Sequence, residues 1–457
     1  MNVSRSSPQV TPPGPRWARA GLVGFAVWGS CAATGLMLWQ MPGLADWFAA
    51  ATRPAAKVAP YRLKLGPVAA PGVETALLQR RIAANPTGWL DLVGLAHVYM
   101  GQARATGDLS WYLLADQAAR RSLVNHVRAN HGAKLVLLNI SIAKHDFISA
   151  RRLVSEVALQ APGNPDLLAA SVSLYLATGD VAQAALAAEA LVRLEPSSGA
   201  LTQRALVRIA QGRDAEAIAD FQAAVAREQA GAPAASALTR AWWGRLHASR
   251  GRLEAAFDLY GEALRLQPES AVILGLSADL ELHAGQYAKA ATHYEQAFRH
   301  SQGPACLIGL AKIKTRQGDL QAAGRLQADA EAQLRQDLKD GGYGHRRDLA
   351  RLLLTRGRAG DDLEALALMA VETQFRHDPE TLAVQAWALT RAGRWPEARQ
   401  AVQRALASGV RDAALYHQAG LIMAKLGEQA HARDLFRAAR LTDPTYRPRS
   451  GAAPVPG

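Results

Sequence analysis

Most of the chain carries hydrophobic residues at intervals of three and four positions, the spacing that places them on one face of an α-helix. Short polar segments that contain glycine or proline interrupt this pattern repeatedly. Runs of valine and isoleucine, which favour strands, are scarce. The abundant alanine, leucine and arginine lose little conformational freedom in a helix. The pattern therefore predicts an all-α chain of many short amphipathic helices.

The helical pattern repeats at a period of roughly 34 residues between positions 85 and 443, which is the length of a helix–turn–helix unit. The unit at 413–444 shows the repeat most clearly, and the unit at 237–268 matches it position by position. The recurring residues of the clearest unit are Tyr416, Gly420, Met423, Gly427, Ala432, Phe436, Ala439 and Pro444. About nine or ten units share this register, which makes the repeat a strong signal.

Each recurring residue type has a physical role in such a unit. Small residues, such as Ala290 and Ala297, allow the two helices to cross closely. Glycine supplies a turn with positive φ, and proline ends the second helix because its ring clashes with the preceding turn. One unit cannot bury its apolar face alone, so we expect the units to stack into a continuous core.

These residues resemble the tetratricopeptide repeat (TPR) family, and the resemblance covers most of the chain. It implies a right-handed superhelical solenoid of antiparallel helix pairs. It also implies a concave groove, lined mainly by the first helix of each pair, that holds peptides or partner domains. The resemblance is to membrane-anchored bacterial members of the family, because an apolar segment precedes the repeats.

Departures from the repeat mark the expected boundaries. The first unit is lengthened around 101–110, and three glycines follow the long helix that ends near Lys339. The unit after these glycines is degenerate. The predicted organisation is a disordered tail (1–15), a transmembrane anchor (16–45), a linker (46–84), an N-terminal repeat array (85–339), a glycine-rich break (340–347), a C-terminal repeat array (348–446) and a disordered tail (447–457).

The apolar segment is long enough to cross a membrane. No charged residue occurs from Ala20 to Ala45, and a hydrocarbon core of about 30 Å requires roughly 20 residues. Trp17 and Trp39 stand near its ends, as interfacial anchors do. The competing interpretation is a cleaved signal peptide, but its apolar core would be about 7–15 residues long. We therefore predict an uncleaved, single-pass anchor.

The charges beside this segment are nearly balanced, with three arginines before it and four basic residues between Arg53 and Lys64 after it. A short basic tail is costly to translocate, whereas a long C-terminal domain crosses regardless of its charge. We expect the tail in the cytoplasm and the repeats in the periplasm, with the anchor in the inner membrane of a bacterial cell.

No motif for catalysis is present. The nucleotide-binding, zinc-protease and nucleophile-elbow motifs are absent, and the twelve histidines are dispersed. Cys306 is interpreted as a small buried hydrophobe and no metal site is expected. We predict that the protein is not an enzyme and that it uses no cofactor.

The family register predicts which residues line the groove. In the C-terminal half these residues are basic and aromatic, the types that dominate binding hot spots. Packing between repeats is the competing interpretation for both tryptophans. The predicted groove residues are Trp242, Arg245, Lys312, Arg316, Arg356, Trp387, Arg391, His417 and Gln418.

The leading hypothesis is a non-catalytic scaffold or assembly factor of the bacterial cell envelope that binds a protein or peptide partner with an acidic segment. The net charge of +13 also suits nucleic acid or another polyanion on the cytoplasmic side. The predicted membrane span argues against this alternative, so no nucleic acid is expected. A regulatory subunit of a membrane enzyme complex is a third alternative.

Overall fold

The computed structural model describes residues 72–106, 110–228, 232–339 and 345–448. The predicted N-terminal tail and transmembrane anchor lie outside the described residues, as does nearly all of the C-terminal tail. Among the helices that the structure does describe, none combines the length and the apolar character needed to span a bilayer.

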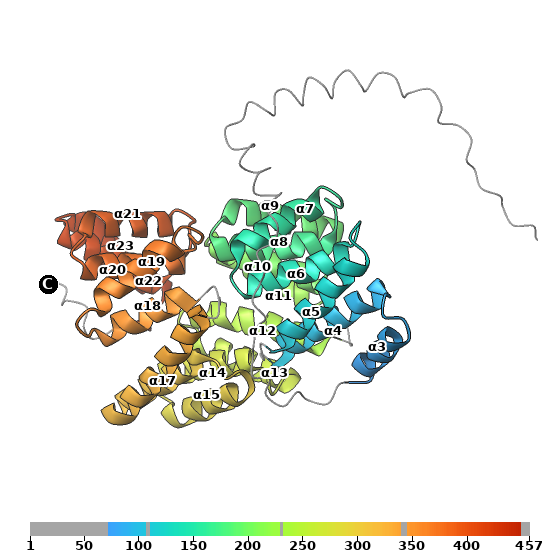
Figure 1. Ribbon diagram of the computed structural model, residues 1–457. Helices are drawn as coiled ribbons and strands as arrows, with labels where there is room; N and C mark the ends of the chain where they lie inside the picture. Colours follow the sequence, from blue (N-terminus) through green and yellow to red (C-terminus); the bar gives the residue numbers. More distant parts are fainter. Residues whose placement is uncertain (1–71, 107–109, 229–231, 340–344, 449–457) are drawn as a thin grey trace, which may run out of the picture. The chain divides into compact units, whose positions relative to one another are not determined.

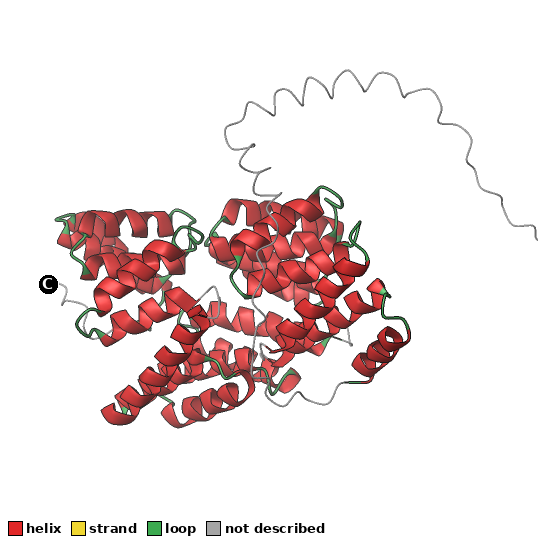
Figure 2. Ribbon diagram, viewed as in Figure 1, coloured by secondary structure: helices red, strands yellow, loops and turns green. Residues whose placement is uncertain are grey.

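The described residues form twenty-one helices and no strand (Figures 1 and 2). In chain order the helices are α3 Val73–Ala84, α4 Trp89–Thr106, α5 Ser110–Asn125, α6 His131–Ala143, α7 Phe147–Ala158, α8 Pro165–Thr178, α9 Val181–Leu194, α10 Ser198–Ala210, α11 Asp214–Val225, α12 Pro233–Ala248, α13 Leu253–Leu266, α14 Ala271–His283, α15 Tyr287–Ser301, α16 Pro304–Arg316, α17 Leu320–Lys339, α18 His345–Arg356, α19 Asp361–Glu372, α20 Pro379–Arg391, α21 Trp395–Leu406, α22 Ala413–Lys425 and α23 Gln429–Thr442.

From α4 onward the helices pack as consecutive pairs, each pair formed by neighbours in the sequence, and each pair also packs against the next. This arrangement confirms the predicted all-α, TPR-like array of helix pairs. The right-handed sense of the superhelix stays a prediction.

Short polar residues explain where many of these helices begin. An N-cap side chain accepts a hydrogen bond from a backbone N–H of the first turn, which would otherwise lack a partner. Proline occupies the first position of α8, α12, α16 and α20, where its missing N–H costs nothing. The residues that cap in this way include Asn130, Asp146, Asn164, Asp180, Ser197, Asp378 and Asp412.

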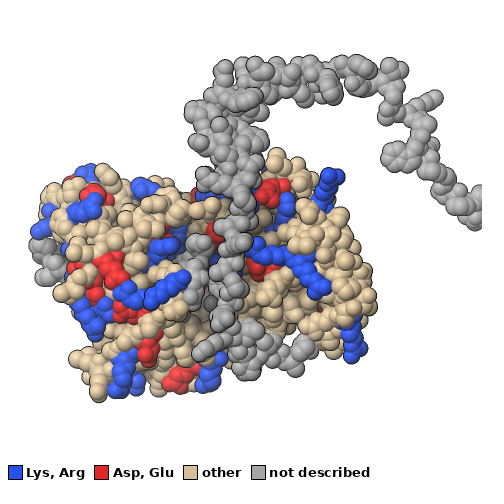
Figure 3. Space-filling view, viewed as in Figure 1, with Lys and Arg blue, Asp and Glu red and all other residues tan. Residues whose placement is uncertain are grey.

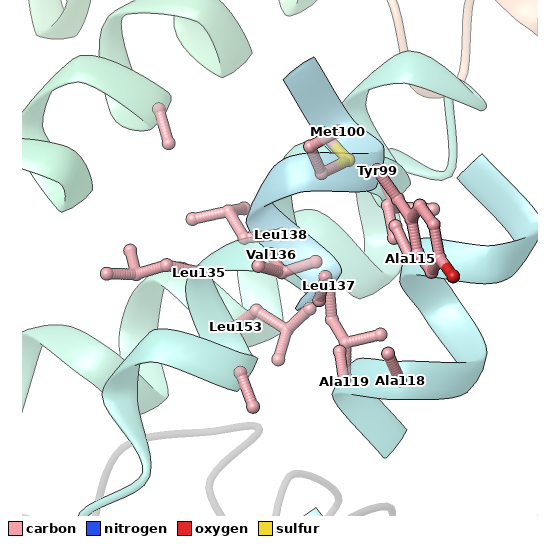
Figure 4. Packing of buried hydrophobic residues seen from close by; sticks show 14 of the residues in the cluster. Tyr99, Met100, Ala115, Ala118, Ala119, Leu135, Val136, Leu137, Leu138 and Leu153 are labelled. Carbon is pink, nitrogen blue, oxygen red and sulfur yellow. The ribbon is translucent and has the colours of Figure 1, made fainter. Parts of the chain in front are cut away.

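Alanine in the second helices permits the close approach within each pair. The equivalent residues Ala150, Ala184, Ala217, Ala256 and Ala290 are all 0% exposed. Around these contacts leucines and aromatic residues fill the space between pairs. In the N-terminal core, Tyr99 and Met100 of α4, three alanines of α5 and Leu135 to Leu138 of α6 converge with Leu153 of α7 (Figure 4). The core is therefore a continuous stack built from several pairs.

Two boundaries and one unit differ from the sequence prediction. Residues 73–84 were assigned to the linker but form α3, which packs against α4 because it buries Ile82 in the N-terminal core. Helix α18 begins at His345, inside the predicted break at 340–347. The degenerate unit that follows forms a complete pair, α18 and α19, whose core includes Leu349, Leu353 and Met369.

The first helices of successive pairs contact one another from α4 to α16 and again from α18 to α22. Between α16 and α18 this contact is at most marginal. Successive second helices do not reach the same contact anywhere in the described chain. The stack therefore bends with its first helices on the inside, and we call the surface that they form the inner face.

Replacing Ala290 with Trp is expected to destabilise the fold by about 1–3 kcal/mol through overpacking. Ala290 is fully buried against α14, whereas its neighbour Lys289 is exposed on the same helix. Thermal unfolding of Ala290→Trp and of the control Lys289→Trp measures the difference. Equal unfolding temperatures for both variants and the parent would contradict the assigned register.

Candidate protein-interaction surface

Trp242 and Arg245 lie together on α12. Trp242 packs at the edge of the α10–α12 core, and Arg245 is exposed. The Arg245 guanidinium carbon lies 5.6 Å from the centroid of the Trp242 ring, a distance at which cation and ring attract each other. The Trp242 ring thus packs against the α10–α12 core and also holds the exposed Arg245 cation on the inner face.

The next first helices carry charges of both signs. Lys312 and Arg316 of α16 are exposed. Helix α14, between α12 and α16, carries the exposed Asp279, whose Oδ1 accepts a hydrogen bond of 2.6 Å from the Tyr294 hydroxyl. Burial and the Asp279 charge raise the pKa of Tyr294, so the hydroxyl keeps its proton and remains the donor. The basic residues are therefore interrupted by a carboxylate.

Arg356 has a structural role, contrary to the expectation that it is a solvated groove residue. Its side chain is only 12% exposed and donates to Asp361 at 2.6 and 2.9 Å. It also pairs with Glu331 of α17. These hydrogen bonds hold the pKa of Asp361 below its usual value. The ion pairs tie α17 to α18 and α19, so Arg356 is committed to the fold.

The remaining predicted residues also contact their own chain. Arg391 is exposed and donates to Asp362 at 3.0 Å. Trp387 packs against the α16–α20 core. His417 lies between the rings of Phe436 and Tyr446, where burial lowers the pKa of its imidazole. Gln418 donates to the Ala383 carbonyl at 3.0 Å. The structure does not bring all nine predicted residues into one surface, and the exposed cations among them are Arg245, Lys312, Arg316 and Arg391.

A cluster that the sequence did not reveal surrounds Glu380, the second residue of α20. Arg347 and Arg351 of α18 contact its carboxylate at 3.0 and 2.7 Å. Partial burial tends to raise the pKa of Glu380, but the charges of Arg347, Arg351 and Arg245 outweigh it and lower that pKa to about 2.

The array also contacts itself across long stretches of sequence. His377 N–H donates to the Thr178 carbonyl at 2.9 Å, and Arg376 Nε donates to the Ala177 carbonyl at 3.3 Å. Arg411 Nη1 donates to Asp214 Oδ2 at 2.9 Å. We call this contact the seam; it joins the turns at 145–148, 177–180, 211–214 and 250–252 to the loops at 373–378, 407–412 and 443–446.

Further side chains complete the seam. The Arg376 guanidinium lies over the Phe147 ring, 5.6 Å from its centroid. Asp214 Oδ2 also accepts from Arg250 Nε at 2.8 Å. His283 and Thr445 share a hydrogen bond of 3.1 Å at the other end. A cavity of about 270 Å³ lies at the first step of the seam, between the α6–α7 turn and α18–α19.

Sequence reasoning missed the seam because the contacting residues lie 199 and 197 residues apart, far beyond one repeat. The available signal was weak. The turn glycines that meet the seam are indistinguishable in sequence from those that do not.

Neither a metal-binding cluster nor an activated thiol is found among the described residues. Within 72–448, apart from the short gaps, no three His, Cys, Asp or Glu side chains are placed to hold a metal ion. Burial raises the pKa of the Cys306 thiol, which favours its unreactive, protonated form.

Similarity to known proteins is found only among solved structures. No protein-family model matches the chain, and no curated protein matches it. A tetratricopeptide repeat protein from Parabacteroides merdae shares 18% identity over 53% of this chain and 92% of its own, with a TM-score of 0.36. The human IFIT1 dimer with PPP-AAAA shares 16% identity over 80% of this chain and 86% of its own, with a TM-score of 0.46. Pseudomonas aeruginosa pilF shares 19% identity over 52% of this chain and 96% of its own, with a TM-score of 0.34.

The described chain is a TPR-like array. This conclusion follows from its repeat register and its consecutive helix pairs. The solved structures resemble it as helical repeats, and no functional argument rests on them.

Arg356→Ala is expected to cost on the order of 3 kcal/mol of unfolding free energy, because it leaves buried carboxylates without their partner. Arg391→Ala, whose ion pair is 44% exposed on the arginine side, should cost less than about 1 kcal/mol. Denaturant unfolding of both variants measures the contrast. If Arg356→Ala were as stable as the parent, Arg356 would be a solvated groove residue and not a structural one.

Asp361 should make the fold sensitive to acid. Because its pKa is lower in the folded chain than in the unfolded chain, its stabilising contribution is present above the unfolded value of about 3.9 and is lost as the pH falls through the folded value. Asp361→Asn should therefore be less stable at neutral pH and lose less stability on acidification. The control Asp434→Asn removes a carboxylate that is 71% exposed. Parallel stability–pH curves for parent and Asp361→Asn would count against the ion pair.

Proposed function

We propose that this protein is a non-catalytic interaction scaffold or assembly factor of the bacterial cell envelope, which binds an acidic segment of a partner on its inner face. The observation that carries the proposal is the continuous row of first helices with the exposed cations Arg245, Lys312 and Arg316. An extended chain can follow such a row because each helix pair contributes a similar surface.

Charge and apolar area act together in this surface. The Arg245 cation is held over Trp242, so a carboxylate can pair with the cation while an apolar side chain meets the ring. Asp279 between the cations disfavours a uniformly acidic ligand at that step. We therefore expect a segment in which acidic residues alternate with apolar or neutral ones.

The wider surface does not show a uniform basic field. Lys and Arg side chains are interspersed with Asp and Glu on the visible face (Figure 3). Many arginines are paired with carboxylates inside the array, as at Arg204 and Asp220 or Arg240 and Glu262. Such pairing reduces the charge available to a polyanion, and it favours a peptide over nucleic acid as the ligand.

Reversing the three exposed cations, as Arg245→Glu, Lys312→Glu and Arg316→Glu together, should weaken binding of a Glu-rich peptide by about tenfold or more. The reason is the loss of three positive charges from exposed side chains of the inner face. Fluorescence anisotropy with a labelled peptide measures the affinity.

A matched control reverses three exposed arginines on second helices, Arg265, Arg299 and Arg433. It makes the same change in net charge away from the inner face. Equal losses in both triple variants would show that only net charge matters and would contradict an inner-face site. Tighter binding of single-stranded DNA than of the peptide, with steep salt dependence, would favour the polyanion alternative.

The envelope location rests on the apolar segment at 16–45, and it has its own test. An alkaline phosphatase reporter fused after Pro448 should be active in a bacterial host, because that enzyme requires the oxidising periplasm. A reporter that works only in the cytoplasm should be inactive at the same site. The opposite pair of results would place the repeats in the cytoplasm.

A further inference from the structure

The seam closes one side of the array at successive steps. A backbone hydrogen bond joins His377 to Thr178, and a side-chain atom at Gly179 or Gly212 would collide with the backbone of His377 or Gly409. At Gly251 an added Cβ would lie 2.6 Å from Asp443 Oδ1. No chain segment can pass between the two sets of helix pairs at these points while the seam is formed.

The contacts across the seam are nevertheless mostly polar. It consists of hydrogen bonds, the Asp214–Arg411 ion pair, glycine contacts and the contact of Arg376 with the Phe147 ring. No hydrophobic core cluster of the described residues includes side chains from both sides of it. Contacts of this kind exchange for water at low net cost, whereas a shared apolar core does not. Breaking the seam contacts would therefore separate no shared hydrophobic core cluster of the described residues.

The packing of first helices changes at one step between the two sides. First helices contact one another on both sides of the seam, but the contact between α16 and α18 is at most marginal. The pairs up to α16–α17 and the pairs from α18–α19 onward are each continuous. Relative movement at this step would have to preserve the packing of α17 against α18 and the core that Leu334 shares with Leu349 and Leu353.

We propose that the seam is a latch that opens as a unit to admit the partner segment to the inner face. This inference rests on the proposed function. A partner segment that binds better to the open form shifts the equilibrium towards that form.

The turn glycines offer a matched experiment. Gly212, Gly393 and Gly427 all have positive φ in the turn between two paired helices, so replacement by Ala strains each of them similarly. Only Gly212 faces the seam; an added Cβ at Gly393 or Gly427 meets nothing within 4 Å. Gly212→Ala should open the seam, and Gly427→Ala should not.

A second matched pair uses ion pairs and avoids backbone strain. Arg411 is 41% exposed and contacts Asp214 across the seam at 2.9 Å. Arg399 is 42% exposed and contacts Glu428 at 2.8 Å away from it. Arg411→Ala should therefore weaken the seam, while Arg399→Ala serves as its control.

Hydrogen exchange of the His377 amide reports seam opening directly, because that N–H is bonded to the Thr178 carbonyl. We expect exchange to accelerate about tenfold in Gly212→Ala and Arg411→Ala, equivalent to roughly 1.4 kcal/mol of opening free energy. Exchange should stay unchanged in the two controls. Unchanged exchange in both seam variants would overturn the latch.

The same variants then test access. The Glu-rich peptide should associate severalfold faster with the seam variants than with the parent or the controls, measured by stopped-flow anisotropy. One outcome is a seam variant that binds the peptide and shows faster hydrogen exchange but associates with the peptide at the parent's rate. That result would overturn the gating alone. Failure of every form to bind the peptide would overturn the proposed function, and the gating with it.

Discussion

The close contact between the two helices of each pair determines the geometry of this protein. Ala184, Ala217, Ala256, Ala290 and Ala398 are each 0% exposed at that contact, where no larger side chain fits. Because the first helices also touch across successive pairs and the second helices do so less, the stack bends. Continued over many pairs, the bend returns the chain to its own earlier turns, and the seam forms where they meet. Helix packing, inner face and seam therefore follow from one packing constraint.

Much of the fold was predictable because it depends on local patterns. The 34-residue register, the turn glycines and the capping residues act within one unit, so the sequence predicts the pairs and most of their boundaries. The exceptions have physical causes. Helix α3 lies outside the register and forms by docking Ile82 on the first pair. The pair of α18 and α19 keeps the buried alanine of its second helix, Ala365, but lacks the small residue of the first helix, where leucines and ion pairs make the contact.

The candidate site was less predictable, because the register places a residue on a helix face but does not identify its partner. Arg245, Lys312 and Arg316 are exposed, but Arg356 is enclosed by Glu331 and Asp361. Those carboxylates belong to neighbouring helices, and their approach depends on packing angles that a repeat pattern does not specify. The Glu380 cluster and the seam depend still more on the accumulated bend.

The central claim is that the inner face binds its ligand only after two parts of the array separate at the seam. A distance measured across the seam by pulsed electron paramagnetic resonance tests it most directly, with spin labels at the exposed Ala215 and Ala407 after both native cysteines are replaced. The account predicts a single short distance in the unbound protein and a distinctly longer one in the complex with the Glu-rich peptide. The same short distance in the bound protein would contradict it.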